Sequence, residues 1–516
     1  RMDDPPARLA LVRVEYTGDV GERYLVPLRF FADAQGTLPG SADGGAVLVR
    51  LRGTGSGGTT LEGALCEALM DESVRAALLE TVARRREIRG MAGELSASGS
   101  RAVRLAAMEG ALPLPSRVSH SADAHSVIVY GDRLMLKLYR RIGEGTATEL
   151  EIGRFLTERA GFPHTPPVLG WLEYRAGQGE SATLAVLHPF IPNEGTAWEH
   201  ALDEVQSFFE RALTRTGDLP QVERAGAGLL DLADEPLPVV AEETIGAYLE
   251  SARSLGSRTA ELHRALASAP DDPAFEPEPF TTFYQRSLYQ AVRSLHGRVT
   301  GLLRGEGLRA GSAQEGEQFL AREEDVLDLV RPLLARRLEG RRTRCHGDYR
   351  LTRVLRAGAE FTITGFGGDP GVPLAESRVR RSPLTDVAGM LASFREAAWY
   401  GLRGAGPGAI RPDDVARLEP WAEFWLRWVS ASFLRSYLER MEGSQLLPPR
   451  GPDLDLLLRT LLLERGLESL ARALARDGSR RQEEERGVGV GVGGGGDGAA
   501  AAVALRGVLD LLPMQA

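Results

Sequence analysis

The sequence predicts an α+β fold in which a strand-rich N-terminal part precedes a mostly helical C-terminal part. Two observations predict it. Alternating apolar and polar residues at 9–31 and 126–141 indicate two hairpins, the second with its turn at Gly131-Asp132. After residue 197, apolar residues recur at spacings of three and four, which is typical of amphipathic helices.

The first 115 residues are expected to form a small α/β domain. The hairpin at 9–31 is followed by a Gly/Pro/Ser-rich stretch and by the strand "AVLVRL" at 46–51. Helical patterns follow near 60–70 and 72–87, and "LPLPS" at 112–116 ends the domain. We therefore expect a separate cap domain over 1–115.

A second strand-rich domain is expected at 116–197. The hairpin at 126–141 carries Lys137 in its second strand, and a helix at 147–159 carries Glu149 and Glu151. Another strand pair ends with "LAVLHPFI" at 184–191. This order of elements is found in the small lobe of a protein-kinase-like fold: strand, turn, strand with a lysine, helix with a glutamate, and a strand that leads into a hinge.

The remainder is expected to form a helical lobe over 198–477. The segment "TIGAYLESARSLGSRTAELHRAL" has a clear apolar stripe. Further helices are predicted at 280–304, 321–338, 382–400, 412–440 and 453–475. The Gly-rich stretch at 478–502 predicts disorder, and 503–516 a short C-terminal segment.

Composition narrows the class of protein. The formal net charge of −9 argues against nucleic acid as the main partner, since phosphate-backbone binding needs a basic surface. No apolar run approaches the roughly 18 residues of a membrane span. Two cysteines predict reduced thiols and a cytoplasmic protein. Because the chain opens with Arg1, we expect a fragment or the downstream part of a longer polypeptide.

Lys137 is a candidate phosphate ligand because it is the only lysine in a chain with 61 arginines. The lysine ammonium is a compact point charge, whereas the arginine guanidinium is planar and presents several donors. A single retained lysine therefore indicates a position where arginine cannot replace it. Glu151, or in second place Glu149, is expected to pair with it. The alternative is a surface lysine on an edge strand.

Asp348, in "HGDY" at 346–349, is the candidate general base. Kinases position a nucleotide and an acceptor, neutralise phosphate charge and use an aspartate to accept the hydroxyl proton. His346 is expected to shape the loop around Asp348. Asp386, in the first turn of the helix after "SP" at 382–383, is expected to support the loop from behind. The alternatives are a chance tripeptide and an ordinary helix-start aspartate.

Taken together, these blocks resemble the maltokinases, a family related to the aminoglycoside phosphotransferases. The resemblance rests on segments spread over nearly the whole chain, namely "VIVYGDRLMLKLYRR", "LEIGRFLTE", "FPHTPPVLG", "LGSRTAELHRALA", "HGDY" and "RSPLTDVAGMLASF". It implies a two-lobe kinase-like fold with an N-terminal cap. It also implies ATP- and Mg²⁺-dependent phosphorylation of maltose to maltose 1-phosphate, a role in trehalose and glycogen metabolism, and trehalose synthase as a fusion or complex partner.

The active-site positions depart from that family. Arg353 and Gly365 stand where the family has its two magnesium ligands, and Arg350 stands where it has a histidine. The stretch 346–370 predicts a His-Gly-Asp loop followed by a two-stranded hairpin. Asp369 at its end, opposite the family's second glutamate, is the remaining candidate metal ligand. Since Mg²⁺ requires oxygen ligands, we expect impaired catalysis, with Arg350 and Arg353 binding ATP phosphates in place of the ion. Two alternatives stay open: an active sugar kinase whose metal is held by Asp369, and a nucleotide- or sugar-binding pseudokinase with a regulatory role.

Overall fold

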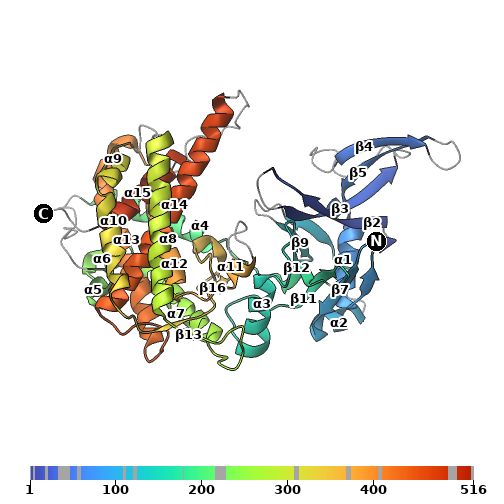
Figure 1. Ribbon diagram of the computed structural model, residues 1–516, viewed down its shortest axis with the longest axis horizontal. Helices are drawn as coiled ribbons and strands as arrows, with labels where there is room; N and C mark the ends of the chain where they lie inside the picture. The colour runs from blue at the N-terminus through green and yellow to red at the C-terminus, as the bar shows by residue number, and fades with distance from the viewer. Residues whose placement is uncertain are drawn as a thin grey trace. The chain divides into compact units, whose positions relative to one another are not determined.

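The chain divides into two compact units in the computed structural model (Figure 1). The first unit is Arg1–Pro192 with Phe366–Arg378, and the second is Asn193–Gly365 with Val379–Ala516. Strands dominate the first unit and helices the second, so the predicted α+β class is confirmed. The structure describes residues 2–3, 6–17, 21–32, 47–54, 60–108, 112–119, 125–177, 179–215, 228–306, 313–367, 374–404, 410–485 and 497–512.

A five-stranded antiparallel sheet in the order β1-β2-β3-β5-β4 opens the first unit. Its strands are β1 (Met2–Asp3), β2 (Pro6–Val14), β3 (Glu22–Ala32), β4 (Val47–Thr54) and β5 (Thr60–Glu67). The predicted hairpin is confirmed, because β2 pairs with β3. The predicted helix near 60–70 is wrong, because β5 pairs with both β3 and β4. A Cβ on Gly63 would lie 2.3 Å from the carbonyl oxygen of Phe31, so only glycine fits this close pairing.

A seven-stranded sheet in the order β6-β7-β11-β12-β10-β9-β8 forms the rest of the first unit. Its strands are β6 (Glu87–Arg89), β7 (Glu94–Gly99), β8 (Ser116–Ser119), β9 (His125–Tyr130), β10 (Leu134–Tyr139), β11 (Gly170–Arg175) and β12 (Ser181–Pro189). The predicted domain boundary at 115 does not divide the structure, because β7, from the expected cap, pairs with β11. Helices α1 (Glu72–Ala83) and α2 (Arg101–Met108) accompany this sheet.

The β9–β10 hairpin positions Lys137. Gly131 and Asp132 both have positive φ, 54° and 48°, as a type I′ turn requires. Leu136 and Leu138 are fully buried on one face of β10, so Lys137 lies on the other face. Helix α3 (Thr148–Arg154) continues into a π-helical turn, Phe155–Ala160.

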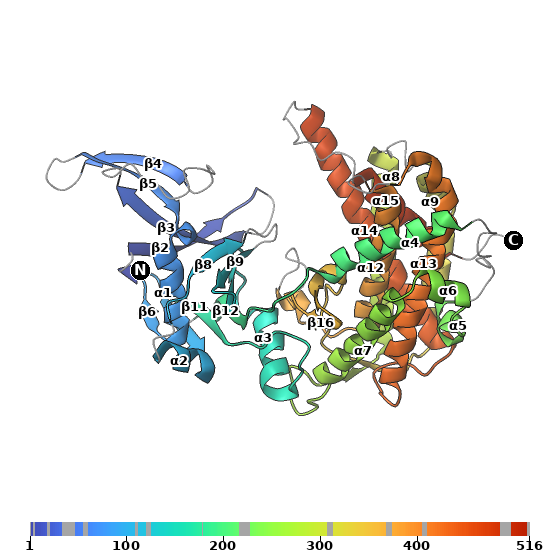
Figure 2. The ribbon, with the colours of Figure 1, turned by 180° about the vertical axis from the view of Figure 1, so that it is seen from behind.

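The second unit is built mainly of helices (Figures 1 and 2). They are α4 (Ala197–Thr214), α5 (Leu229–Asp234), α6 (Val239–Thr244), α7 (Tyr248–Leu266), α8 (Thr282–Glu306), α9 (Ala313–Ala321), α10 (Glu323–Val330), α12 (Leu384–Arg403), α13 (Pro412–Met441), α14 (Pro452–Glu485) and α15 (Asp497–Leu509). Helix α13 packs between α7 and α12. The buried aromatic side chains Trp399, Trp425, Phe394 and Phe433 fill this core.

The last two helices of the second unit correct one prediction. The predicted disorder over 478–502 is wrong at both margins, since α14 runs to Glu485 and α15 begins at Asp497. Residues 486–496 lie outside the described residues. Helix α11 (Leu374–Ser377), which follows the hairpin after Asp348 in sequence, belongs to the first unit.

The segment with the candidate base Asp348 lies in the second unit between short elements. Strand β13 (Glu278–Pro279) pairs with β14 (Arg341–Arg342), which leads into "CHGDY" at 345–349. A 3₁₀ turn, Leu351–Arg353, follows, and the hairpin of β15 (Val354–Ala357) and β16 (Glu360–Ile363) comes next. The predicted loop-then-hairpin order is therefore confirmed.

Candidate functional site

Lys137 in the first unit forms a buried ion pair with Glu149. The Nζ of Lys137 donates to Oε2 of Glu149 at 2.7 Å, and the two side chains are 13% and 8% exposed. The hydroxyl of Tyr139 donates to the same oxygen at 2.7 Å. Since Lys137 and Tyr139 are two residues apart in β10, both side chains lie on one face of the strand.

Electrostatics keep Glu149 ionised. Burial favours the neutral acid, but Lys137, the neighbouring His188 and the Tyr139 hydroxyl outweigh it and lower the pKa of Glu149 to about 2. Burial lowers the pKa of His188 below its ordinary value. The first unit thus holds a preorganised ammonium–carboxylate pair inside a polar cluster.

Glu151 was expected to be the partner of Lys137, and the structure corrects this. Glu151 Oε2 accepts instead from Nε of Arg378 at 3.2 Å. Residues 149 and 151 are two apart on α3, and so point about 200° away from each other around the helix axis. Glu149 is buried beside β10, whereas Glu151 is only half-buried. The ranking of the two glutamates was therefore wrong.

Asp348 in the second unit is held by two arginines. Arg350 Nη2 lies 2.9 Å from Oδ1 and 3.0 Å from Oδ2. Arg353 contacts Oδ2 with Nε at 3.0 Å and Nη2 at 2.9 Å. Burial alone would raise the pKa of Asp348, but the guanidiniums of Arg350 and Arg353 lower it below its ordinary value. The carboxylate is ionised. Its Oδ2 accepts hydrogen bonds from both guanidinium groups, and its Oδ1 forms an ion pair with Arg350.

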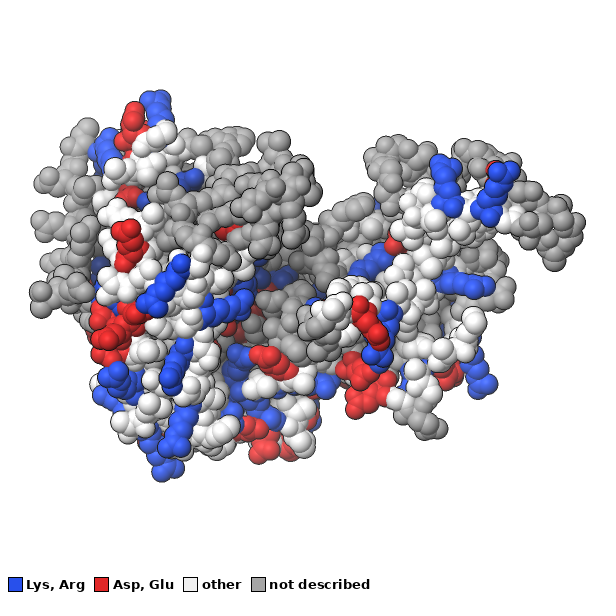
Figure 3. Space-filling view, turned by 45° about the horizontal axis from the view of Figure 1, so that its top comes forward, with Lys and Arg blue, Asp and Glu red and all other residues white. Residues whose placement is uncertain are grey.

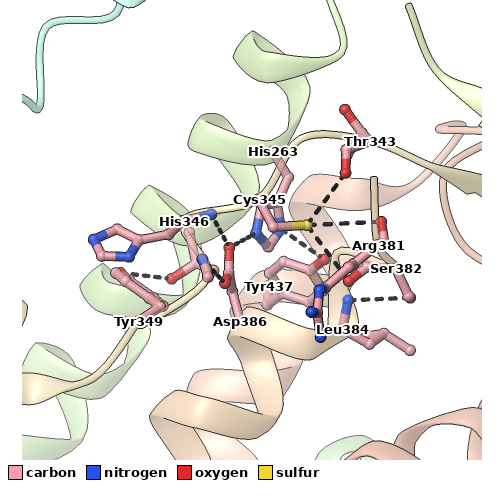
Figure 4. Close-up of polar contacts among 12 residues, drawn as sticks. His263, Thr343, Cys345, His346, Tyr349, Arg381, Ser382, Leu384, Asp386 and Tyr437 are labelled. Carbon is pink, nitrogen blue, oxygen red and sulfur yellow. Dashed lines mark hydrogen bonds and ion pairs between the residues drawn. The ribbon is translucent and has the colours of Figure 1, made fainter. Parts of the chain in front are cut away.

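Asp386 supports the loop from behind (Figure 4). Its Oδ2 accepts from the backbone N–H of His346 at 2.7 Å, and its Oδ1 accepts from that of Gly347 at 2.9 Å. Oδ2 also lies 3.1 Å from Nε2 of His263, whose Nδ1 lies 3.0 Å from the Tyr437 hydroxyl. Asp386 and His263 are fully buried. Although burial opposes ionisation, these donors lower the pKa of Asp386 below its ordinary value.

His346 connects the loop to the following hairpin. Its Nε2 lies 2.8 Å from the carbonyl oxygen of Thr364, and its Nδ1 accepts from the Asp348 N–H at 3.3 Å. The ring is 1% exposed, and burial lowers the pKa of His346. His346 and Asp386 therefore make the loop contacts that their expected supporting roles require.

The residues present do not fit a magnesium ion at the two expected ligand positions. Gly365 has no side chain, and its φ of +81° disfavours any replacement with a side chain. Arg353 fills the space beside it, since a Cβ on Gly365 would lie 3.1 Å from Cδ of Arg353. No cluster of three or more potential metal ligands occurs among the described residues. Asp369, the remaining candidate, lies outside them.

Sequence reasoning missed Tyr139, His188 and Glu396 as members of these clusters. Period-2 alternation along β10 was the available signal for Tyr139, because it faces the same way as Lys137. His188 lies on β12 opposite Met135 of β10, and cross-strand pairing of that kind is not visible in the sequence. Glu396, on α12, interacts electrostatically with Arg350.

The described surface carries both signs of charge. On the face drawn in Figure 3, acidic and basic side chains are interspersed. Among the described residues, no helix is both long enough and apolar enough to span a bilayer.

Comparison with known proteins identifies relatives among sugar kinases, although no family model matches the chain. A glucosamine kinase from Streptacidiphilus jiangxiensis is 25% identical over 297 residues, which are 57% of this chain and 55% of that protein. A glucosamine kinase from Mycolicibacterium smegmatis (strain ATCC 700084 / mc(2)155) is 30% identical over 207 residues, 38% of this chain and 43% of that protein. The chain thus spans about half the length of the curated relatives it matches.

Similarity to a solved structure extends further. A glucosamine kinase in complex with glucosamine, ADP and inorganic phosphate superimposes with a TM-score of 0.60 at 19% identity. The match covers 98% of this chain and 94% of the other. At this level of identity the match shows the fold, so the predicted kinase-like class is confirmed.

Proposed function

We propose that this chain is an ATP-binding protein of the sugar-kinase type whose phosphate transfer is impaired. The observation that carries the proposal is the state of Asp348, which is buried and bonded by Arg350 and Arg353 through both oxygens. Each unit supports a different part of this proposal. The first unit supports nucleotide binding, and the second supports slow phosphate transfer.

Nucleotide binding is supported by the Lys137–Glu149 pair. An ammonium held by a carboxylate is the arrangement that kinases use to bind nucleotide phosphates. The pair is almost fully buried, and Tyr139 donates to the same carboxylate, so the Lys137 ammonium is already oriented. We assign Lys137 to ATP phosphates and Glu149 to holding it.

Impaired transfer follows from the chemistry of a general base. A base must lie within hydrogen-bond reach of the proton it takes, and its pKa should lie near the working pH. Asp348 has a lowered pKa, and a substrate hydroxyl must displace a guanidinium to reach it. Arg350 and Arg353 place positive charge where phosphate oxygens can bind, which favours ATP binding over proton transfer. Since the described residues do not fit Mg²⁺, we assign no step to the metal.

An amino sugar is the acceptor we propose, with glucosamine as its representative. The support is the similarity to glucosamine kinases in both sequence and fold. Maltose is the second candidate because of the maltokinase-like blocks described above. Trehalose synthase as a partner and a role in trehalose or glycogen metabolism depend on that second candidate and stay predictions, as does a cytoplasmic location.

A working sugar kinase is the second candidate function. One observation favours it: the HGD loop keeps its support, with Asp386 accepting two backbone N–H groups and His346 bonded to Thr364. A chain selected only for binding has no need of a rigid loop around Asp348. On this alternative, Arg350 moves away when the acceptor binds. The opposite alternative is a pseudokinase, in which the same site binds nucleotide or sugar and transfers no phosphate.

Two measurements test the proposal. Calorimetry should detect ATP binding in EDTA as well as in Mg²⁺, and Lys137→Ala should abolish it. A coupled assay with glucosamine and with maltose should give transfer at least about 100-fold slower than a glucosamine kinase assayed alongside. Rates equal to that enzyme would contradict impairment and favour the working kinase, whereas absence of ATP binding would contradict the whole proposal.

A further inference from the structure

Arg350 has a donor that Asp348 does not use. Its Nη2 contacts both oxygens of Asp348, whereas its Nε is buried and has no hydrogen-bond partner among the described residues. A buried donor without an acceptor costs about 1–3 kcal/mol. The Arg350 side chain is 38% exposed as a whole, so it has room to rotate. A second acceptor near Arg350 would therefore remove this cost.

Helix α12 runs directly along the catalytic loop. A Cβ on Gly389 would lie 2.5 Å from the carbonyl oxygen of Tyr349, so the helix touches the loop backbone there. One turn later, Ser393 Oγ accepts from the N–H of Leu351 at 3.1 Å. Positions 389, 393 and 396 share one face of a helix. The next side chain on the loop-facing stripe is therefore Glu396, on which Arg350 acts electrostatically.

Glu396 is a carboxylate with incomplete pairing. Its Oε1 accepts from Ser469 Oγ of α14 at 3.3 Å, which is its one hydrogen bond among the described residues. Burial raises the pKa of Glu396 above its ordinary value, while Arg350, Arg472 and Arg465 act in the opposite direction. Among these arginines, Arg350 has the largest electrostatic effect on Glu396. A direct guanidinium contact would complete the bonding of both Arg350 and Glu396.

We propose that Arg350 is a gate with two carboxylate partners, Asp348 in the blocked state and Glu396 in the open state. In the blocked state Arg350 covers Oδ1 of Asp348. In the open state Arg350 turns to Glu396, Oδ1 becomes available to an acceptor hydroxyl, and Arg353 continues to hold Oδ2. Glu396 is then a positioning residue that acts through Arg350. This inference rests on the proposed function and adds its control element.

The gate predicts that two substitutions have opposite effects on transfer. Arg350→Gln removes the block and should raise kcat by about tenfold or more. Glu396→Gln weakens the open state and should lower kcat by a similar factor, with little change in ATP affinity. The double variant should behave like Arg350→Gln, because Glu396 has no role once the arginine is absent. A purely structural Glu396 would lower kcat in both backgrounds.

Thermal unfolding provides a measurement that does not depend on activity. It compares four proteins: wild type, Arg350→Gln, Glu396→Gln and the double variant. Residues that interact give non-additive changes in Tm, whereas distant residues add. We expect the 350/396 cycle to be non-additive by about 2 °C or more. The control cycle combines Arg350→Gln with Glu323→Gln, which removes a glutamate bound by Arg304 and should be additive. Arg350→His provides a second variant of the gate.

The outcomes separate this inference from the proposed function. Additive changes in Tm for the 350/396 pair, or equal effects of Glu396→Gln with and without Arg350, would overturn the gate. If no variant transfers phosphate, the transferase part of the proposed function fails, while the unfolding cycle still decides whether Arg350 and Glu396 interact. Non-additive Tm together with opposite effects on kcat supports both.

Discussion

Arg353 contacts a single oxygen of Asp348 with two of its nitrogens, Nε at 3.0 Å and Nη2 at 2.9 Å. The same arginine lies against Gly365, whose missing side chain provides the space that Cδ of Arg353 approaches. The two departures from the expected ligand set are therefore coupled. Arginine at 353 uses the space beside residue 365 and places its positive charge against the Asp348 carboxylate.

The first prediction concerns which glutamate holds Lys137. Glu149→Gln removes a buried charge that accepts from both Lys137 and Tyr139, and should weaken ATP binding at least about tenfold and lower the stability by about 3 kcal/mol. Glu151→Gln is the matched control on the same helix, because Glu151 pairs with Arg378. It should leave ATP affinity within about twofold. Calorimetry of ATP binding to the two variants is the test. A larger loss of ATP affinity in Glu151→Gln than in Glu149→Gln would contradict the assignment.

Asp386 gives the second prediction. Asp386→Asn turns one acceptor into a donor facing N–H groups of the loop, and should lower the free energy of unfolding at pH 7 by about 3 kcal/mol. Because the folded pKa of Asp386 is lowered, its contribution is complete above the unfolded pKa and is lost as pH falls through the folded value. The difference from wild type should therefore shrink below about pH 4.

Urea titrations from pH 3 to pH 7 would measure this dependence. Asp328→Asn, which removes an exposed partner of Arg331, is the control and should change stability by less than about 0.5 kcal/mol. A constant deficit for Asp386→Asn across the acid range would show that the charge of Asp386 does not stabilise the loop.

Glu464 on α14 gives a third prediction with the opposite sign. Burial, together with the neighbouring Glu468, raises the pKa of Glu464 to about 7. A carboxyl with a raised folded pKa makes the protein lose stability as pH rises from the unfolded value, about 4.3, to the folded value. Glu464→Gln removes this loss. The variant should be more stable than wild type at pH 8 by about 3 kcal/mol and nearly equal to it at pH 4.

Thermal or urea unfolding at the two pH values would test this prediction. Glu439→Gln, an exposed position on α13, is the control and should show no comparable pH-dependent gain. A Glu464→Gln variant that is destabilised equally at both pH values would show that Glu464 is ionised and bonded in the folded protein.

Sequence patterns predicted the parts of this fold that local geometry determines. The Gly131-Asp132 turn and the alternation around it specified the hairpin that presents Lys137, and the apolar stripe specified α7. The prediction of a helix at 60–67 was wrong because these residues suit a helix, whereas pairing with β3 and β4 makes the segment a strand. Long-range pairing of that kind leaves no local periodic signal.

The site was predictable to the same extent. Lys137, His346, Asp348 and Asp386 stood out by residue type and by their order in the chain, and the structure gives each a hydrogen-bond or ion-pair partner. The choice between Glu149 and Glu151 depended on the rotation of α3 relative to the sheet, which the sequence alone did not determine. Arg350 and Arg353 were visible as departures, but their capture of Asp348 required coordinates.

The most direct test of impairment is restoration of the expected ligand types. Arg353→Gln with Gly365→Asp frees Asp348 from one guanidinium and adds a carboxylate at 365, where aspartate tolerates positive φ better than most residues. The φ of +81° should still lower stability by about 1–3 kcal/mol. Arg356→Gln, which removes a partner of Glu194, is the matched arginine control.

The deciding measurement is the rate of Mg²⁺-dependent phosphate transfer from ATP to glucosamine and to maltose, for wild type and the 353/365 double variant. We predict that the double variant is at least about 100-fold faster than wild type and that the Arg356→Gln control is unchanged. Fast transfer by the wild-type chain, lost in the double variant, would contradict it.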